Sequence, residues 1–263
     1  MKCTAKITAV FLLAVCATAA GTYYYVKGNA SSLIKDSASG NIDKQIQEFI
    51  EKNPEVLIKS LTNYQNNQVK KQAEGAEKYI NSNWDKIAKN PNDPFAGNPD
   101  GDITIVEFFD YSCGYCKHAL PVIQEILKKD PKIKFVFKEF PILSENSDLA
   151  SRAALAVYET DKTKYFAFHQ NLLTKSPSGI KGILAAVSEI GLDPAVIEKK
   201  INESKNNKDS LIQKTLTDTR NLAGAAGIGG TPAFIVQGQL YPGALDLPKL
   251  EELVKNARDK NNK

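Results

Sequence analysis

Hydrophobic residues recur at helical spacing in the N-terminal part of the chain. Ile42 and Ile46 lie four residues apart and begin one apolar face. Asn53 and Pro54 then predict the start of a second helix, because asparagine is a frequent N-cap and proline suits the first helical position. We therefore expect a helical segment over residues 41–90. Its middle is too polar to pack inside a monomer, so it is either a solvated helix or an oligomerisation arm.

A run of Pro, Gly, Asn and Asp over residues 90–101 predicts turns at a domain boundary. Residues 103–109 are mostly apolar, which is typical of a strand buried within a sheet. Helical spacing over residues 117–129 and alternation over residues 132–140 predict a helix and a second strand. This order predicts a β-α-β unit.

The pattern is helical only from about residue 146 to about residue 226. Residues 232–236 then predict a strand, and residues 239–241 return beside it after a tight turn. A last helix is expected over residues 247–258. The order of β-α-β, helical insertion and β-β-α predicts an α/β domain over residues 101–263.

The composition limits the classes of function. Of the 263 residues, 42% are hydrophobic, which is enough for a substantial core. The net charge of +4 is small against 34 basic and 30 acidic side chains, and lysine supplies nearly all of the positive charge. We expect no nucleic-acid partner, because such binding requires a concentrated basic face.

Residues 1–20 have the features of a signal peptide. Two lysines, Lys2 and Lys6, precede an apolar run over residues 7–15, and residues 17–19 match a small-x-small cleavage site. An uncleaved membrane anchor is the alternative, because the weakly polar stretch over residues 7–26 is about long enough to span a bilayer. Residues 21–40, rich in Ser, Gly and Ala, predict a flexible tether. Both interpretations place the body of the protein in an exported, periplasmic setting, where disulfides can persist.

Candidate chemistry concentrates in the run Cys-Gly-Tyr-Cys at residues 113–116. The only other cysteines, Cys3 and Cys16, lie in the leader. A C-x-x-C pair closes too small a loop to be a strong structural link, so redox exchange or metal binding is its expected use. Zinc would need a second cysteine pair, whereas Cu(I) held by the two thiolates stays open as an alternative. For redox exchange we expect no small-molecule cofactor.

The strand-turn-helix pattern places Cys113 at the first turn of a helix. Unpaired amide groups and the helix dipole favour an anion there, so we expect Cys113 to be the attacking thiolate, with a pKa below that of a free thiol. Cys116 lies one turn further in and would resolve the mixed disulfide. The size of the pKa depression decides whether the pair acts as an oxidase, an isomerase or a reductase.

Three further residues, Glu107, Thr231 and Pro232, are candidate site residues. Glu107 lies in an apolar strand, where a buried carboxylate could exchange a proton with Cys116; an edge-strand position facing water is the alternative. Lys138, on the next strand, is either its partner or a solvated lysine. Thr231 and Pro232 begin a predicted strand. A proline at this position leaves the preceding backbone groups free to pair with a substrate chain. X-Pro bonds can also be cis at small energetic cost.

Three separated motifs resemble the DsbA-like branch of the thioredoxin superfamily. Residues 106–117 contain the cysteine pair, residues 137–143 read Phe-Lys-Glu-Phe-Pro-Ile-Leu, and residues 227–234 read Gly-Ile-Gly-Gly-Thr-Pro-Ala-Phe. The resemblance runs from about Asp102 to the C-terminus. It implies a thioredoxin fold with a helical insertion over about residues 146–226.

The same resemblance implies roles for individual residues. Cys113 is the nucleophile, Cys116 is the resolving thiol, Glu107 is buried near the pair, and a cis bond at Pro232 faces the active site. The prototype of the family has Pro-His between its cysteines where this chain has Gly-Tyr. The resemblance therefore does not imply strong oxidising power. Residues 42–102 are more loosely similar to the N-terminal segment of ScsC proteins, the suppressors of copper sensitivity, in which it serves oligomerisation.

Together these features predict an exported protein-disulfide oxidoreductase that forms or isomerises disulfides. Its substrates would be unfolded or partly folded exported proteins with cysteines, and a membrane redox partner would restore its active state. The N-terminal segment favours a homo-oligomer, as in an isomerase. A periplasmic copper-handling protein that binds Cu(I) through Cys113 and Cys116 is the alternative function.

Overall fold

The computed structural model describes residues 41–261. The expected signal peptide and tether lie outside the described residues, as do Cys3 and Cys16. The chain divides into two compact units, residues 1–68 and residues 69–263. Within residues 41–261, no helix combines the length and the apolar character needed to cross a membrane.

The described part of the first unit is helical, as predicted. One helix covers residues 41–52, and α2, Pro54–Ser82, begins at the proline expected in its first position. The side-chain amide of Asn53 donates to the carbonyl oxygen of Phe49 at 2.8 Å, so this side chain serves the end of the preceding helix. Several large apolar side chains of this unit are about half exposed, namely Ile42, Ile46, Phe49, Leu57 and Leu61. The unit therefore presents apolar surface that its own residues do not cover.

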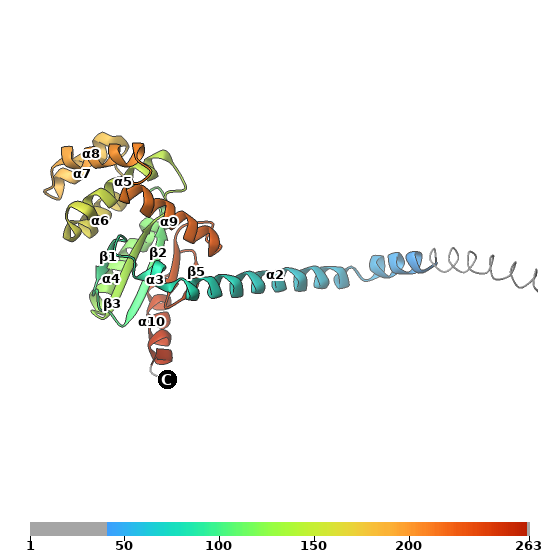
Figure 1. Ribbon diagram of the computed structural model, residues 1–263. Helices are drawn as coiled ribbons and strands as arrows, with labels where there is room; N and C mark the ends of the chain where they lie inside the picture. The colour runs from blue at the N-terminus through green and yellow to red at the C-terminus, as the bar shows by residue number, and fades with distance from the viewer. Residues whose placement is uncertain (1–40, 262–263) are drawn as a thin grey trace, which may run out of the picture. The chain divides into compact units, whose positions relative to one another are not determined.

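The second unit is built on a sheet of five strands: β1 Phe95–Gly97, β2 Ile103–Phe109, β3 Ile133–Glu139, β4 Ala233–Val236 and β5 Gln239–Pro242. Their order across the sheet is β1-β3-β2-β4-β5. β2 and β3 are parallel, and the other neighbours are antiparallel. The predicted β-α-β unit therefore places β2 at the centre of the sheet (Figure 1).

Strand β1 was not predicted, because it lies among the turn formers of residues 90–101. It pairs antiparallel with β3, with Phe95 opposite Val136. Three residues are too few for an alternating pattern to stand out among turn formers. Gly97 ends this strand with a φ of +80°, and a Cβ atom there would collide with the carbonyl oxygen of Ile133. Glycine is therefore needed where the edge strand turns away.

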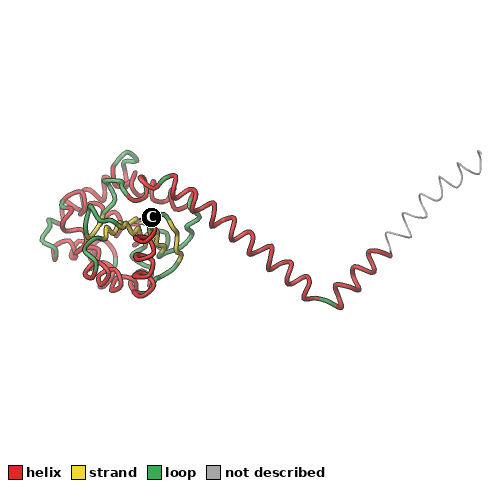
Figure 2. Tube along the Cα trace, turned by 90° about the horizontal axis from the view of Figure 1, so that it is seen from below, coloured by secondary structure: helices red, strands yellow, loops and turns green. Residues whose placement is uncertain are grey.

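Helices cover both faces of the sheet. On one face, α4 Gly114–Lys129 and α10 Leu247–Asn261 pack against Ile105 and Phe109 of β2. On the other face, the end of α2, α3 Trp84–Ala88 and α9 Leu211–Ala225 pack against Val106 and Phe108. Figure 2 shows the strands enclosed between these helices. This layering confirms the predicted α/β class.

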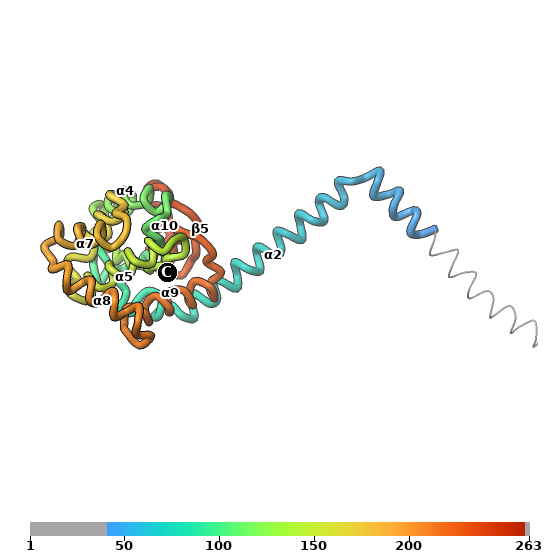
Figure 3. The backbone as a smooth tube through the Cα atoms, turned by 90° about the horizontal axis from the view of Figure 1, so that it is seen from above, coloured from blue at the N-terminus to red at the C-terminus, as the bar shows by residue number. Residues whose placement is uncertain are grey.

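A helical insertion connects β3 to β4, as the pattern predicted. It consists of α5 Glu145–Thr160, a short 3₁₀ turn Lys162–Lys164, α6 Tyr165–Lys175, α7 Gly179–Glu189, α8 Pro194–Asn206 and α9 (Figure 3). The hydroxyl of Ser144 caps α5 by accepting from the backbone N–H of Ser147 at 3.0 Å. α5 is the central helix of the insertion, since most of its alanines and its Leu155 and Val157 are buried.

Both interpretations of Lys138 were wrong, because its side chain is neither a partner of Glu107 nor exposed to solvent. Side chains alternate along β3, so Lys138 faces away from the side that carries Phe137. It is 1% exposed and forms an ion pair with buried Asp93, and its ammonium group also donates to the carbonyl oxygen of Lys86 at 3.2 Å. The segment before β1 is thereby fastened to the centre of the sheet.

Candidate active site

The cysteine pair lies where β2 gives way to α4. Cys113 is the N-cap of α4, and its sulfur accepts a hydrogen bond from the backbone N–H of Cys116 at 3.4 Å. Cys113 is 6% exposed and Cys116 is fully buried, whereas Tyr115 between them is 69% exposed. Neither thiol takes part in a disulfide. The outer sulfur is thus at the surface end of the helix, and the inner one is shielded behind it.

The environment of Cys113 favours its thiolate. Burial opposes ionisation, but hydrogen bonds from Thr231 and from the amides of Cys116 and Tyr115 lower the pKa of the thiol overall. As a thiol, Cys113 donates to the carbonyl oxygen of Thr231 at 3.2 Å. The Thr231 hydroxyl has no hydrogen-bond partner within the described residues, so it is free to donate once the sulfur carries a charge. This is the physical basis for an activated thiolate at a helix N-terminus.

Cys116 has the opposite character. Burial raises the pKa of its thiol strongly, and the negative charge of Glu107 raises it further. A thiol in this setting stays protonated until a base removes its proton. The two thiols therefore differ in acidity: Cys113 ionises more readily than a free thiol, and Cys116 less readily.

The structure shows that Glu107 is a buried residue of a central strand, so the edge-strand alternative was wrong. It is 1% exposed and pairs with Phe137 of β3 on one side and Phe234 of β4 on the other. Burial raises the pKa of its carboxyl to about 8, and the charges of Cys113 and Glu139 add to this effect. Neither carboxyl oxygen has a hydrogen-bond partner among residues 41–261. A carboxyl that titrates near neutral pH is suited to proton exchange.

The loop before β4 brings a distant part of the chain to the site. The Thr231–Pro232 peptide bond is cis, which confirms what the family resemblance implied. Through the contact between Thr231 and Cys113, this loop lies directly against the outer cysteine. His118, two residues beyond Cys116, is exposed on α4.

Asp110 is a site residue that the sequence analysis missed. Its buried carboxylate accepts hydrogen bonds from the backbone N–H of Ser112 at 2.7 Å, from the hydroxyl of Ser147 at 2.6 Å and from the backbone N–H groups of Ile142 and Leu143 at 2.8 and 3.0 Å. These bonds fasten the loop that carries the nucleophile to the segment that enters α5. An aspartate two residues before a serine at a strand end is a signal for such a turn, because the side chain can accept from the backbone two residues on.

The lowered pKa of Cys113 leads to a testable expectation. Alkylation of reduced protein by iodoacetamide should show a rate midpoint below the pH of about 8.5 at which a free thiol ionises. Cys116 should not react in the folded protein, because its thiol is buried and its pKa is raised. The rate should be followed by mass spectrometry in a Cys116→Ser variant as well, so that the midpoint belongs to Cys113 alone. A midpoint at that of a free thiol would contradict the activation described here.

A buried thiol behind a nucleophilic one at a helix N-terminus, on a five-stranded α/β sheet, defines a thiol-disulfide oxidoreductase with a thioredoxin fold. Residues 104–255 match the family described as DSBA-like thioredoxin domain, and the chain belongs to this family. This membership confirms the family resemblance and the thioredoxin fold with a helical insertion.

Three relatives illustrate the similarity. Alpha-DsbA2 from Wolbachia pipientis, a thiol-disulfide exchange protein, is 34% identical, with a TM-score of 0.63, over 69% of this chain and 95% of its own. Disulfide bond formation protein D of Bacillus subtilis is 25% identical over 61% of this chain and 75% of its own. ScsC of Proteus mirabilis is 28% identical, with a TM-score of 0.56, over 85% of this chain and 98% of its own. The protein is accordingly a protein-disulfide oxidoreductase, whose partners are proteins with cysteines.

Proposed function

We propose that this protein forms or isomerises disulfides in exported proteins through Cys113 and Cys116. The observation that carries the proposal is the difference in acidity between the two thiols. Hydrogen bonds lower the pKa of Cys113, and burial raises the pKa of Cys116. The leader at residues 1–20 supports export to the periplasm, followed by a tether over residues 21–40. The helical segment over residues 41–90 and the domain over residues 101–263 would then be the mature body.

The exchange follows from the site. In the oxidised protein, a substrate thiolate attacks the Cys113 sulfur, which forms a mixed disulfide and releases Cys116 as a thiolate that is protonated by the Glu107 carboxyl. A second substrate thiolate attacks the substrate sulfur of the mixed disulfide and releases Cys113 as a thiolate. Two electrons pass from the substrate to the protein, and the substrate gains one disulfide. A membrane redox partner would remove those electrons.

The reverse sequence serves reduction and isomerisation. The Cys113 thiolate attacks a substrate disulfide and forms the mixed disulfide. Cys116 then gives its proton to the Glu107 carboxylate and attacks the Cys113 sulfur, which releases the substrate thiolate. Thr231 and Pro232 would guide the substrate, because their loop contacts the nucleophile and an extended chain could pair with the backbone there.

The direction of the reaction decides between oxidase and isomerase. Reduced and oxidised glutathione should be equilibrated with the protein, and the redox state of Cys113 and Cys116 should be read by thiol labelling. We expect exchange with glutathione and catalysed refolding of a substrate with scrambled disulfides. Binding of Cu(I) at one equivalent without any catalysed exchange would refute the proposal in favour of the copper-handling function, for which two soft thiolate ligands are the supporting observation.

The half-exposed apolar residues of the first unit support the proposal that it serves self-association. The match to ScsC, which covers 85% of this chain, extends into this segment. Sedimentation of the mature protein should show an oligomer, and a Leu57→Glu, Leu61→Glu variant should shift it towards the monomer because charges cannot be buried in an apolar contact. Lys59→Glu, on the same helix, is the matched control and should leave the oligomer intact. A mature protein that sediments as a monomer would defeat this idea.

A further inference from the structure

A second buried acid lies on the same side of the sheet as Glu107. Glu139 is the last residue of β3 and is 1% exposed. In the parallel register Glu107 is opposite Phe137, and Glu139 is opposite Phe109. Residues two apart along a strand share a face, so both carboxyl groups point into the apolar layer beneath the active site. Strand spacing and rise per residue place their Cα atoms about 8 Å apart.

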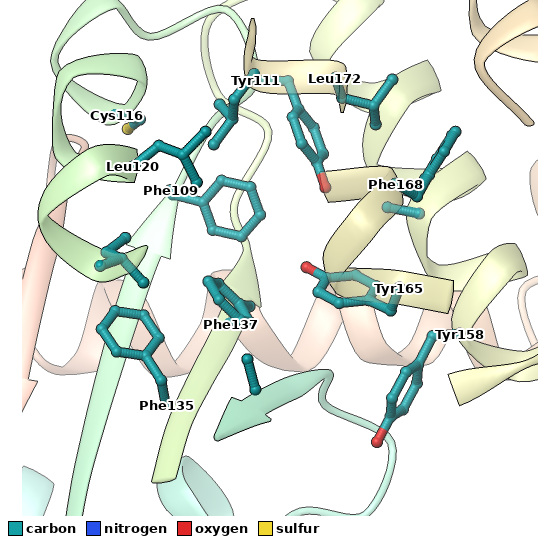
Figure 4. Packing of buried hydrophobic residues seen from close by; sticks show 14 of the residues in the cluster. Phe109, Tyr111, Cys116, Leu120, Phe135, Phe137, Tyr158, Tyr165, Phe168 and Leu172 are labelled. Atoms are coloured by element: carbon teal, nitrogen blue, oxygen red, sulfur yellow. The ribbon is translucent and has the colours of Figure 1, made fainter. Parts of the chain in front are cut away.

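Two tyrosines connect Glu139 to the active-site loop and to the insertion. Its Oε1 atom accepts hydrogen bonds from the hydroxyls of Tyr111 at 3.1 Å and Tyr165 at 2.8 Å. Tyr111 lies two residues before Cys113, and its hydroxyl is also 3.2 Å from Nδ1 of His169 on α6. In Figure 4 the hydroxyl groups of Tyr111 and Tyr165 point toward one another in this layer. We call Glu139, Tyr111, Tyr165 and His169 the buried polar cluster.

Among residues 41–261, no positive charge balances the buried polar cluster. Burial lowers the pKa of His169 to about 3, so its ring is neutral at physiological pH. Burial raises the pKa values of Tyr111 and Tyr165 well above the ordinary range, so both hydroxyls keep their protons. Lys138, the residue before Glu139, faces the opposite side of the sheet and is occupied by Asp93. The cluster therefore contains an acid and neutral donors, with no cation to hold a carboxylate.

The carboxyl of Glu139 consequently keeps its proton to a higher pH than an ordinary carboxyl. Burial raises its pKa to about 8 against the opposing effects of Ser151, Tyr165 and Tyr111, and the charge of Asp110 raises it further. The Oε2 atom of Glu139 has no hydrogen-bond partner in the described part of the chain. Glu107 meets a similar environment, with burial, Cys113 and Glu139 raising its pKa and with Cys116 beside it.

We propose that Glu139 is a positioning residue that acts through Glu107: the two carboxyls share a single negative charge, and Glu139 thereby sets the pH at which Glu107 accepts the proton of Cys116. The proposal rests on the function assigned to Glu107 above. Two like charges in one apolar layer repel, so the second carboxyl cannot ionise as readily as the first. An ionised Glu139 keeps the proton on Glu107, and a neutral Glu139 lets it leave.

The proton balance of the resolving step shows where this matters. Cys116 transfers its S–H proton to the Glu107 carboxylate and attacks the Cys113 sulfur, while the substrate sulfur leaves as a thiolate. The step therefore needs Glu107 in its ionised form. Above its pKa the step is fast, and below it the step slows. Tyr111 and Tyr165 stabilise a charge on Glu139 by donating to it, which places part of the shared charge away from Glu107.

The test is the pH dependence of the resolving step, measured as release of a labelled peptide from the Cys113 mixed disulfide by rapid mixing. Replacing Glu139 with Gln removes the competing charge, so the midpoint should move to lower pH. With the Cα separation of about 8 Å taken as the distance between the charges, and an effective dielectric constant of about 20, the expected shift is about one to two pH units. Leu172→Ala, in α6 beside the cluster, is the matched control, because it weakens packing without changing charge.

A second variant covers the case in which Glu139→Gln does not fold. Tyr165→Phe removes one donor to Glu139, which raises the pKa of Glu139 and should move the midpoint in the same direction by less. Carbon NMR of the Glu107 carboxyl should report the same order of shifts. An unchanged midpoint in Glu139→Gln, or in Tyr165→Phe where that variant alone folds, overturns the inference. A midpoint that Leu172→Ala shifts equally also overturns it, because packing alone would then suffice. Loss of the midpoint in Glu107→Gln is expected in every case, and its persistence there would refute the role of Glu107 itself.

Discussion

Replacing Cys113 with Ser should abolish disulfide exchange, whereas replacing Cys116 with Ser should trap mixed disulfides. We expect the outer sulfur to make the first attack, because its thiolate is stabilised at the N-terminus of α4. Serine at position 113 cannot form a disulfide, so we expect activity to fall to the uncatalysed level. Serine at position 116 leaves the attack intact but removes the group that resolves the intermediate.

The measurement is non-reducing electrophoresis of each variant after incubation with an unfolded substrate that contains one disulfide. Cys116→Ser should give a covalent adduct that a reducing agent cleaves, and Cys113→Ser should give no adduct. Ser112→Ala is the matched control, since it alters the neighbouring side chain and leaves both thiols in place. Catalysed exchange by the Cys113→Ser variant would contradict the assignment of the nucleophile.

The second large effect concerns stability. Replacing Asp93 with Ala should lower the free energy of unfolding by about 3–5 kcal/mol, because the buried ammonium of Lys138 would lose its charged partner. Denaturant unfolding monitored by circular dichroism measures the change. The exposed pair of Lys175 and Glu189 offers a comparison, and Glu189→Ala should lower stability far less, because solvent screens an exposed ion pair.

A double variant shows whether that loss of stability comes from an unpaired buried charge or from the absence of the ion pair itself. Asp93→Leu combined with Lys138→Met replaces both charges with apolar groups of similar size. Stability should recover towards that of the wild type, because no unpaired charge remains buried. A double variant as unstable as Asp93→Ala would instead mean that the fold needs the ion pair itself.

Local patterns in the sequence predicted the parts of the site that lie close together in the chain. The apolar strand over residues 103–109, the C-x-x-C and the following helical spacing fixed Cys113 at a helix N-terminus. The family resemblance supplied the partner loop at Thr231 and Pro232, which more than a hundred residues separate from the cysteines. Strand alternation could not reveal which strand is central, so Glu107 kept two interpretations until the sheet order was known.

The residues that escaped prediction depend on contacts across the chain. Lys138 pairs with Asp93, 45 residues away, through a short edge strand hidden among turn formers. Glu139 shares its alternation phase with Phe135 and Phe137, which was a readable signal that it points inward. Its partners come from the active-site loop and from α6, and no local pattern specifies that Tyr111, Tyr165 and His169 meet.

The hydrogen bonds to the carboxylate of Asp110 have a consequence for chimeras in which the helical insertion is exchanged between related proteins. One side chain anchors the turn before the cysteines and the chain entering α5, through Ser147 and the amides of residues 142–143. A chimera that takes a foreign insertion from beyond Ser147 keeps every donor to this carboxylate. A junction placed before Pro141 makes the incoming segment responsible for three of them, so that graft keeps the turn before the cysteines anchored only if the incoming backbone follows the same path and supplies a hydroxyl at the position of Ser147.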